Sequence, residues 1–115
     1  MTADYDHAVR EHIVDLYEES GELIALIEMI QQPDCLLIEN ISVRPDRHRQ
    51  GLGDALLNHA ENFARSVGLT ELRLYTNAAF ASNIAFYNRR GFDAFLREPI
   101  PAGGELVHMR KRLHQ

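Results

Sequence analysis

The segment from residue 35 to residue 76 most constrains what this chain can fold into. It reads CLLIENISV, then a turn with two glycines, then a helical pattern, then ELRLYT. The two outer runs are apolar and β-branched enough to form strands. A helix between two such strands predicts a βαβ crossover, so we expect the strands at 35–43 and 71–76 to be parallel neighbours in one sheet.

The helix predicted at 52–67 is amphipathic, because its apolar residues recur at spacings of three and four. These residues are Leu52, Ala55, Leu56, Ala60, Phe63, Ala64 and Val67. Gly68 follows as a C-terminal stop. A shorter helix is expected at 82–90, with Ser82 as its N-cap and Gly91 as its stop.

Four more strands complete the expected sheet. They are expected at 11–18, 23–30, 92–98 and 105–113. The turns ESGE and QQPD join the first two strands and the strand at 35–43 into an antiparallel meander. The order is therefore βββ-α-β-α-ββ, which predicts the α+β class with a mixed central sheet flanked by helices. A chain of 115 residues forms one domain, residues 1–115.

Composition limits the classes of partner. The net charge of −5 argues against broad nucleic-acid binding, and the longest apolar runs, of about five residues, are too short to span a membrane. The N-terminus lacks the apolar stretch of a signal peptide, and the single cysteine, Cys35, reads as a buried thiol. We therefore expect a cytoplasmic protein without nucleic-acid or membrane partners. The histidines show no ligand spacing, so we predict no metal site.

The turn before the predicted helix at 52–67 has the features of an anion site. The first N–H groups of a helix lack internal partners, and the helix dipole adds positive charge there. Gly51 and Gly53 have no Cβ, so a ligand can approach the backbone. Four basic residues precede them: Arg44, Arg47, His48 and Arg49. These features predict that the turn binds a phosphate group. Alternatively, the glycines only give the turn the flexible backbone that it needs. Rossmann and P-loop patterns are absent.

Two blocks of sequence carry a family resemblance. VRPDRHRQGLGDALL (43–57) resembles the acyl-CoA loop of the GNAT superfamily of N-acetyltransferases, which reads Gln/Arg-x-x-Gly-x-Gly/Ala after a Val-x-Pro. LYTNAAFASNIAFYNRRGF (74–92) resembles the family's second signature, in which a strand ends in Asn and a helix with Asn and Tyr closes on Gly-Phe. The resemblance covers roughly residues 11–113.

The chain departs from the family pattern at His48, at Arg49, at Asp54 and in the length of its N-terminal region. His48 stands at the Gln/Arg position of the loop, and Arg49 stands where glycine is usual. About ten residues precede the first predicted strand, where family members usually have a strand and one or two helices. Asp54 also lies in the first helical turn, where it would repel a pyrophosphate if it pointed inward.

The resemblance implies an acetyl-CoA-dependent N-acetyltransferase that moves an acetyl group to a primary amine by direct attack. Backbone amides of residues 49–54 would hold the CoA pyrophosphate, and the backbone of residues 41–43 would pair with the pantetheine arm. The implied cofactor-binding residues are Ile41, Ser42, Val43, His48, Arg49, Gln50, Gly51, Leu52, Gly53, Asp54, Asn83 and Tyr87. Arg89 and Arg90 either reach the CoA 3′-phosphate or interact with the helix dipole.

Two residues are candidates for proton transfer. Tyr87 matches the family's tyrosine and is the expected general acid; alternatively, it is packed through its ring with its hydroxyl in water. Glu39 is the expected base, and strand alternation places it on the face of Ile41 and Val43. Alternatively, Glu39 is solvated or ion-paired. Poorer candidates for the base are Glu28 and His108.

The rival to an enzyme is an acyl-CoA-binding module that is non-catalytic or depends on a partner. The acceptor remains open among small amines, amino acids, peptide N-termini, lysines and aminoglycosides. A homodimer is expected, because the short N-terminal region would leave apolar sheet surface exposed.

Overall fold

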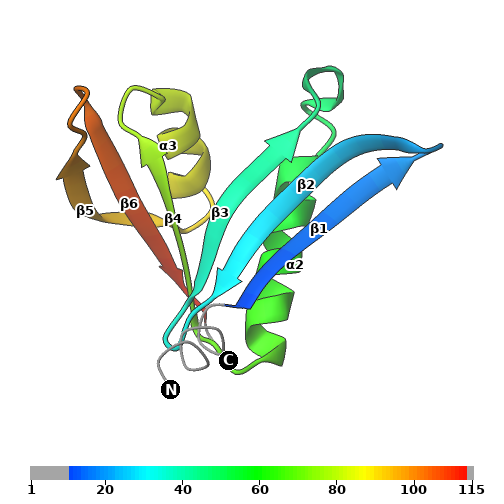
Figure 1. The fold of residues 1–115 in the computed structure, drawn as a ribbon, viewed down its shortest axis with the longest axis horizontal. Coiled ribbons are helices and arrows are strands. Elements are labelled where there is room, and N and C mark those ends of the chain that lie inside the picture. The colour runs from blue at the N-terminus through cyan, green and yellow to red at the C-terminus, as the bar shows by residue number, and fades with distance from the viewer. Residues whose placement is uncertain (1–10, 114–115) are drawn as a thin grey trace.

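The computed structural model describes residues 11–113, which form one six-stranded sheet with two α-helices (Figure 1). The strands are β1 (Glu11–Glu19), β2 (Glu22–Gln31), β3 (Leu36–Val43), β4 (Glu71–Asn77), β5 (Asp93–Pro99) and β6 (Glu105–Arg112). The helices are α2 (Leu52–Ser66), α3 (Ala81–Asn88) and a 3-10 turn, η1 (Pro45–Arg47), which the sequence did not predict. The predicted α+β class and element order are confirmed, and every strand ends within one residue of its predicted limits.

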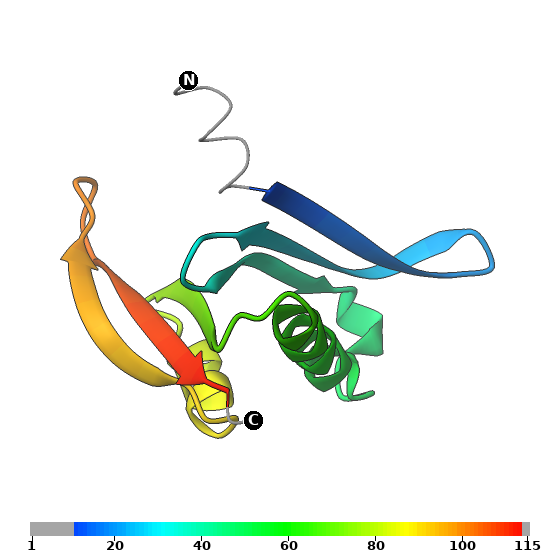
Figure 2. The ribbon, with the colours of Figure 1, turned by 90° about the horizontal axis from the view of Figure 1, so that it is seen from below.

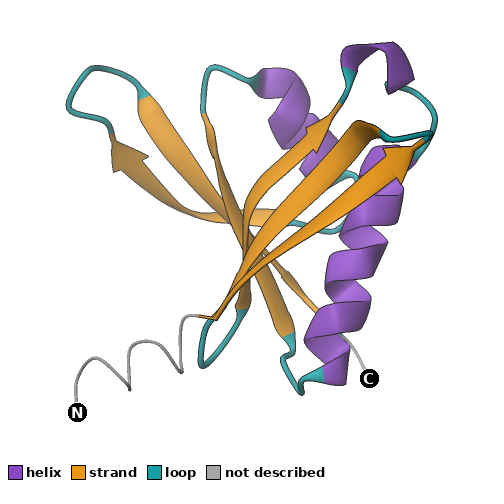
Figure 3. Cartoon of the chain, turned by 45° about the vertical axis from the view of Figure 1, so that its right-hand side comes forward, coloured by secondary structure: helices purple, strands orange, loops and turns teal. Residues whose placement is uncertain are grey.

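The sheet order is β1-β2-β3-β4-β6-β5. Strands β1, β2 and β3 form the predicted antiparallel meander, and β4, β6 and β5 form a second antiparallel set. Strands β3 and β4 are parallel, as the βαβ pattern predicts, but they pair only from Leu36–Leu72 to Ile38–Leu74. Beyond that point the two strands diverge, and the sheet opens as a V towards their C-terminal ends (Figures 1 and 3).

Both α-helices lie on the same side of the sheet (Figure 2). The apolar stripe of α2 packs into a core that it shares with β2, β3, β4 and β6. Its members are Ile27, Met29, Leu36, Ile38, Leu57, Ala60, Ala64, Leu72, Leu74, Phe92, Val107, Met109 and Leu113. Cys35 is buried as predicted, its Sγ donating to Gln32 Oε1 at 3.2 Å, and burial raises the pKa of the thiol to about 11. Within residues 11–113, no helix has the length and apolar character to cross a membrane.

The end of α2 follows the prediction. Gly68 has φ +81°, a left-handed conformation that glycine adopts without steric cost. The N–H of Leu69 donates to the Ala64 carbonyl at 2.8 Å, and the N–H of Gly68 donates to the Arg65 carbonyl at 3.1 Å. These two bonds form a Schellman motif, which satisfies carbonyls at the helix end and turns the chain into β4.

The start of α3 differs from the prediction. Ser82 lies inside the first turn of the helix, and the N-cap is Phe80, without a side-chain cap. A side-chain hydrogen bond instead lies in the loop before the helix, where Asn77 Oδ1 accepts the N–H of Ala79 at 2.9 Å. This Asx turn gives the chain its bend after β4. Gly91, at φ +93°, follows the end of the helix as predicted.

Candidate active site

A β-bulge in β3 sets the direction of Glu39. The register between β2 and β3 shifts just after Ile38, so Glu39 is an extra residue without a partner on β2. Ile38 and Ile41 both lie opposite fully buried residues of β2, so both face the helices. Glu39 follows Ile38 directly and points to the other face. The expectation that Glu39 shares a face with Ile41 and Val43 is therefore wrong, because the bulge resets the alternation.

A hollow lies where β3 and β4 diverge. It is lined by Ile38, Glu39, Asn40, Ile41, Leu74, Tyr75, Thr76, Asn83 and Tyr87. Three predicted site residues, Glu39, Asn83 and Tyr87, come together here from β3 and α3, although they are far apart in the sequence. Tyr75 and Thr76 line the same hollow and were missed by the sequence analysis. The parallel pairing of the two strands was the signal that could have found them, because Tyr75 follows the last paired residue of β4.

Glu39 is held by a tyrosine from the neighbouring strand. The Tyr75 hydroxyl donates a hydrogen bond to Glu39 Oε1. This bond, together with partial burial and the negative charge of the carboxylate, raises the pKa of Tyr75 to about 12. The phenol therefore stays protonated near neutral pH and continues to donate to the carboxylate.

The two poorer candidates for the base have other partners. The Nε2 atom of His108 lies 2.8 Å from Glu98 Oε1, and its ring centroid lies 5.7 Å from that of Tyr75. Glu28 lies 2.9 Å from His12 Nε2. Neither His108 nor Glu28 lines the hollow, whereas Glu39, which accepts a hydrogen bond from Tyr75, does.

Tyr87 reaches the hollow from α3 between two aromatic rings. Its centroid lies 5.3 Å from that of Phe86 and 5.6 Å from that of Phe92, both in edge-on geometry. Burial raises the pKa of Tyr87 above its usual value, because a phenolate is disfavoured in this apolar setting. Within the described chain, neither its hydroxyl nor the side-chain amide of Asn83 makes a hydrogen bond. Both groups are therefore available to a ligand.

The turn before α2 presents backbone N–H groups. The N-cap is Gly51, at φ +77°, and the first helical bond runs from the Ala55 N–H to the Gly51 carbonyl at 3.0 Å. The N–H groups of residues 52–54 thus have no acceptor within the helix. Arg49 has φ +72°, so it keeps the left-handed conformation that glycine, the usual residue here in the family pattern, would favour.

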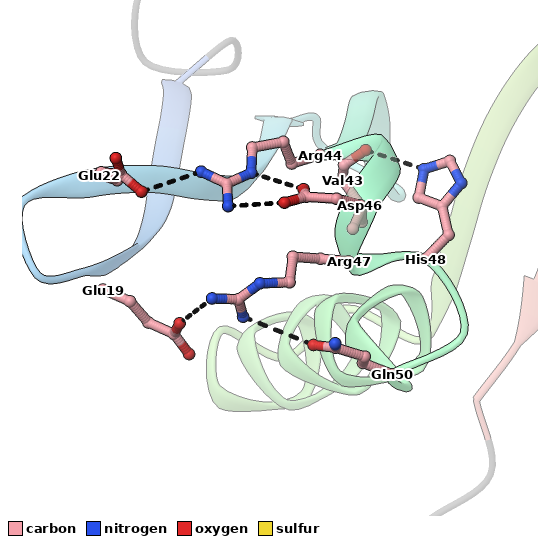
Figure 4. Close-up of polar contacts among 8 residues, drawn as sticks. All are labelled: Glu19, Glu22, Val43, Arg44, Asp46, Arg47, His48 and Gln50. Atoms are coloured by element: carbon pink, nitrogen blue, oxygen red, sulfur yellow. Dashed lines mark hydrogen bonds and ion pairs between the residues drawn. The ribbon is translucent and has the colours of Figure 1, made fainter.

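Two of the four basic residues before this turn are already paired (Figure 4). Arg44 binds Asp46 through two hydrogen bonds, of 2.6 and 2.9 Å, and Glu22 at 3.2 Å. Arg47 pairs with Glu19. These ion pairs tie the turn to the tip of the β1–β2 hairpin. The expectation that all four basic residues serve a phosphate is therefore corrected for Arg44 and Arg47.

His48 has a structural contact as well. Its Nε2 atom lies 2.9 Å from the Val43 carbonyl oxygen (Figure 4). Because a carbonyl oxygen only accepts, the ring nitrogen donates this bond. The imidazole thus closes the 3-10 turn η1 against the end of β3.

The two glycines of the turn have different roles. A Cβ on Gly51 would meet no atom within 4 Å, so its requirement is the left-handed backbone. A Cβ on Gly53 would lie 3.2 Å from Cζ of the Phe86 ring. Gly53 therefore permits the close approach of α2 and α3, and the interpretation that both glycines admit a ligand is corrected for Gly53.

Asp54 and Arg90 neutralise each other. Arg90 contacts the carboxylate through Nε and through Nη2, the latter at 3.0 Å, and its guanidinium lies 3.6 Å above the Phe86 ring. The hydrogen bonds from Arg90 lower the pKa of Asp54 below its usual value. The repulsion expected between Asp54 and a pyrophosphate is thus offset by a neighbouring cation.

Comparison with known proteins identifies the family. The sequence model of the acetyltransferase (GNAT) family matches residues 2–92. The chain belongs to the GNAT family of acetyltransferases. A curated GNAT relative, the [ribosomal protein bS18]-alanine N-acetyltransferase of Escherichia coli K12, is 44% identical over 75 residues, which are 65% of this chain and 51% of the relative. The chain thus spans about half the length of this relative.

Solved structures agree with this assignment. The crystal structure of the ribosomal-protein-S18-alanine N-acetyltransferase from Escherichia coli has a TM-score of 0.78 and 28% identity, covering 90% of this chain and 70% of the other. A GNAT acetyltransferase from Elizabethkingia anophelis, solved with acetyl-CoA bound, has a TM-score of 0.78 and 17% identity, covering 97% and 82%. The second likeness supports the fold alone.

The candidate site fits acetyl-CoA in three respects. The V leaves the β3 edge unpaired over residues 39–43, so a pantetheine amide can bond there. The N-terminus of α2 offers N–H groups to a pyrophosphate. The polar groups of Asn83 and Tyr87 line the same hollow. Among residues 11–113, no three His, Cys, Asp or Glu side chains are grouped to hold a metal ion.

Proposed function

We propose that this protein is an acetyl-CoA-dependent N-acetyltransferase that transfers the acetyl group to a primary amine by direct attack. One observation carries the proposal: the V between β3 and β4 brings Glu39, Asn83 and Tyr87 to one hollow. Membership in the GNAT family supports it. The rival, an acyl-CoA-binding module without turnover, shares the binding features but does not need the two proton-transfer groups.

The chain's part in binding is to hold the donor along β3 and α2. Acetyl-CoA supplies an activated thioester. Backbone N–H groups of residues 49–54 bind its pyrophosphate, and the β3 backbone at residues 41–43 pairs with the pantetheine arm. Asn83 donates to the pantetheine or orders a water. His48 acts on this site by holding the turn closed through the Val43 carbonyl. Positioning of this kind is worth about 7–11 kcal/mol in favourable cases.

Two protons must move. An alkyl ammonium has a pKa near 10, so the acceptor must lose a proton before it attacks. Glu39 takes this proton, directly or through a water, from the open face of the sheet. Tyr87 approaches from the helix side and gives its proton to the leaving thiolate. The second proton, which the nitrogen loses as the amide forms, returns to the Tyr87 phenolate, so the phenol is restored. Burial favours this role, because it keeps the phenol protonated until negative charge develops beside it.

Two relatives bear on the acceptor. The Escherichia coli relative is named for the alanine of a ribosomal protein, and a second relative, streptothricin acetyltransferase of Streptomyces lavendulae, is 40% identical over 57 residues, 50% of this chain and 30% of the relative. We infer that the acceptor is a peptide N-terminus or the amine of a small molecule. Action in the cytoplasm is part of this proposal, since the first relative is named for a ribosomal protein.

A thiol-release assay tests the proposed function. The protein is incubated with acetyl-CoA and a panel of amines: peptides with free N-termini, the same peptides with acetylated N-termini, lysine and an aminoglycoside. Release of free CoA that requires a free amine, with the acetylated product seen by mass spectrometry, supports transfer. Acetyl-CoA binding without release by any amine would instead favour the binding module.

A further inference from the structure

Tyr75 and Glu39 stand at the point where the V begins. Ile38 and Leu74 are the last residues of β3 and β4 that pair, and Glu39 and Tyr75 follow them directly. The side-chain hydrogen bond between this tyrosine and this glutamate therefore takes over where the backbone ladder stops. It is the contact that crosses from one strand to the other at the base of the hollow.

The carboxylate of Glu39 depends on this contact for its orientation. Glu39 is the extra residue of a bulge, so no residue of β2 stands opposite it to fix its direction. Within residues 11–113, Tyr75 is the hydrogen-bond partner of its carboxylate. One of its two oxygens accepts the hydrogen bond from the phenol. The second oxygen is left free to accept a hydrogen bond or a proton from the acceptor amine.

Tyr75 is itself fixed from the other side. Its ring lies 5.7 Å from the ring of His108, which stands opposite it on β6. His108 is anchored by Glu98 of β5 at 2.8 Å. A row of contacts thus runs through Glu98, His108, Tyr75 and Glu39, one residue from each strand between the sheet edge and the hollow. Such a row holds the phenol in one place.

We propose that Tyr75 is a positioning residue for Glu39, the proton acceptor of the transfer reaction; the inference rests on the proposed function. By donating to Oε1, the phenol directs the second oxygen of the carboxylate towards the acceptor ammonium. Tyr75 does not deliver its own proton, because the phenol already donates that proton in its hydrogen bond to the carboxylate of Glu39. The acid and the positioning residue are therefore two different tyrosines, Tyr87 and Tyr75.

Kinetics of three variants test the proposal: Tyr75→Phe, Glu39→Gln and the double variant. Loss of the phenol hydroxyl leaves the α2 N-terminus intact, so KM for acetyl-CoA stays unchanged while kcat falls about tenfold, the scale of one hydrogen bond to a charged group. Glu39→Gln lowers kcat by about 10²-fold or more. The double variant equals Glu39→Gln alone, because Tyr75 acts through Glu39.

A matched control uses another tyrosine that donates to a carboxylate. Tyr17 on β1 bonds Glu19 at 2.7 Å, outside the hollow. Tyr17→Phe removes a hydrogen bond of the same kind and is expected to leave kcat unchanged. A kcat for Tyr75→Phe equal to that of the wild type would overturn the positioning role. So would losses that multiply in the double variant, because Tyr75 would then act independently of Glu39.

A second readout needs no substrate. The pKa of Tyr75 is about 12 while Glu39 is charged beside it. In Glu39→Gln one additional tyrosine should ionise near pH 11, seen as tyrosinate absorbance, since an unperturbed phenol has a pKa near 10. An unchanged absorbance would overturn the contact itself. A wild type that turns over no amine would overturn the proposed function, and the positioning role of Tyr75 with it, whatever the absorbance shows.

Discussion

The two tyrosines of the hollow differ because of what surrounds them. Tyr75 donates a hydrogen bond to the carboxylate of Glu39, so its hydroxyl proton is already engaged. Tyr87 lies between Phe86 and Phe92, and in the described chain its hydroxyl has no partner. A phenol whose proton is not shared with a carboxylate is the better donor to a leaving thiolate. Residue type alone did not separate these roles.

The change Tyr87→Phe tests the acid. It keeps both aromatic contacts, so we expect the free energy of unfolding and the Kd for acetyl-CoA to stay near the wild-type values. The kcat should fall by about 10²- to 10⁴-fold, the usual value of a general acid. Steady-state kinetics and calorimetry on the same preparation give both numbers. Equal kcat values in the two proteins would remove Tyr87 from the mechanism.

Stability at alkaline pH follows from the same two residues. The pKa values of Tyr75 and Tyr87 are raised in the folded chain, Tyr75 to about 12. Above pH 10, near the pKa of an unfolded tyrosine, the folded state binds more protons than the unfolded state. The stability contributed by both groups is therefore complete below about pH 10 and is lost as the pH rises towards their folded pKa values. Urea denaturation from pH 8 to pH 11 should show this decline, and the double variant Tyr75→Phe/Tyr87→Phe should flatten it. The same slope in both proteins would contradict the account.

At the level of elements, the packing of α2 against α3 depends on a glycine. An ideal Cβ on Gly53 would lie 3.2 Å from Cζ of Phe86. Gly53→Ala should therefore move α3 or the Phe86 ring. We expect the free energy of unfolding to fall by about 1 kcal/mol, because the overpacking cost of about 1–3 kcal/mol exceeds the gain of up to about 1 kcal/mol from alanine in a helix. Urea denaturation measures this loss. In the Phe86→Leu background, which removes the ring, Gly53→Ala should cost less than it does in the wild type. An unchanged midpoint for Gly53→Ala in the wild type would contradict the packing role.

The sequence predicted the elements well because their signals are local. The apolar spacing of α2, the stop at Gly68 and the alternation of the strands each depend on neighbouring residues. The bulge after Ile38 has no such signal, since no glycine or proline marks it, and so the face of Glu39 was predicted wrongly. The pairing of Arg47 with Glu19, 28 residues away, depends on the hairpin folding back onto the turn. The sequence cannot reveal that contact without the three-dimensional arrangement.

At the scale of the whole molecule, residues 11–113 place no helix on one face of the sheet (Figure 2). In the described chain, Val14, Leu16 and Leu96 lie on this face and are about half exposed, at 50%, 56% and 52%. The homodimer expected from the sequence remains a prediction, and light scattering of the purified protein tests it. A dimeric mass that becomes monomeric in Val14→Glu/Leu16→Glu would support this face as the interface. A wild-type monomer across the concentration range would contradict it.

We propose that the V between β3 and β4, together with the N-terminus of α2, binds acetyl-CoA. Calorimetric titration of the purified protein with acetyl-CoA, and separately with ATP and NAD, tests it most directly. We expect micromolar binding of acetyl-CoA, with little heat from the other two, because they lack the pantetheine arm that pairs with β3. Equal affinity for acetyl-CoA, ATP and NAD would mean that the site recognises only their phosphate groups. No binding of acetyl-CoA would contradict the proposal.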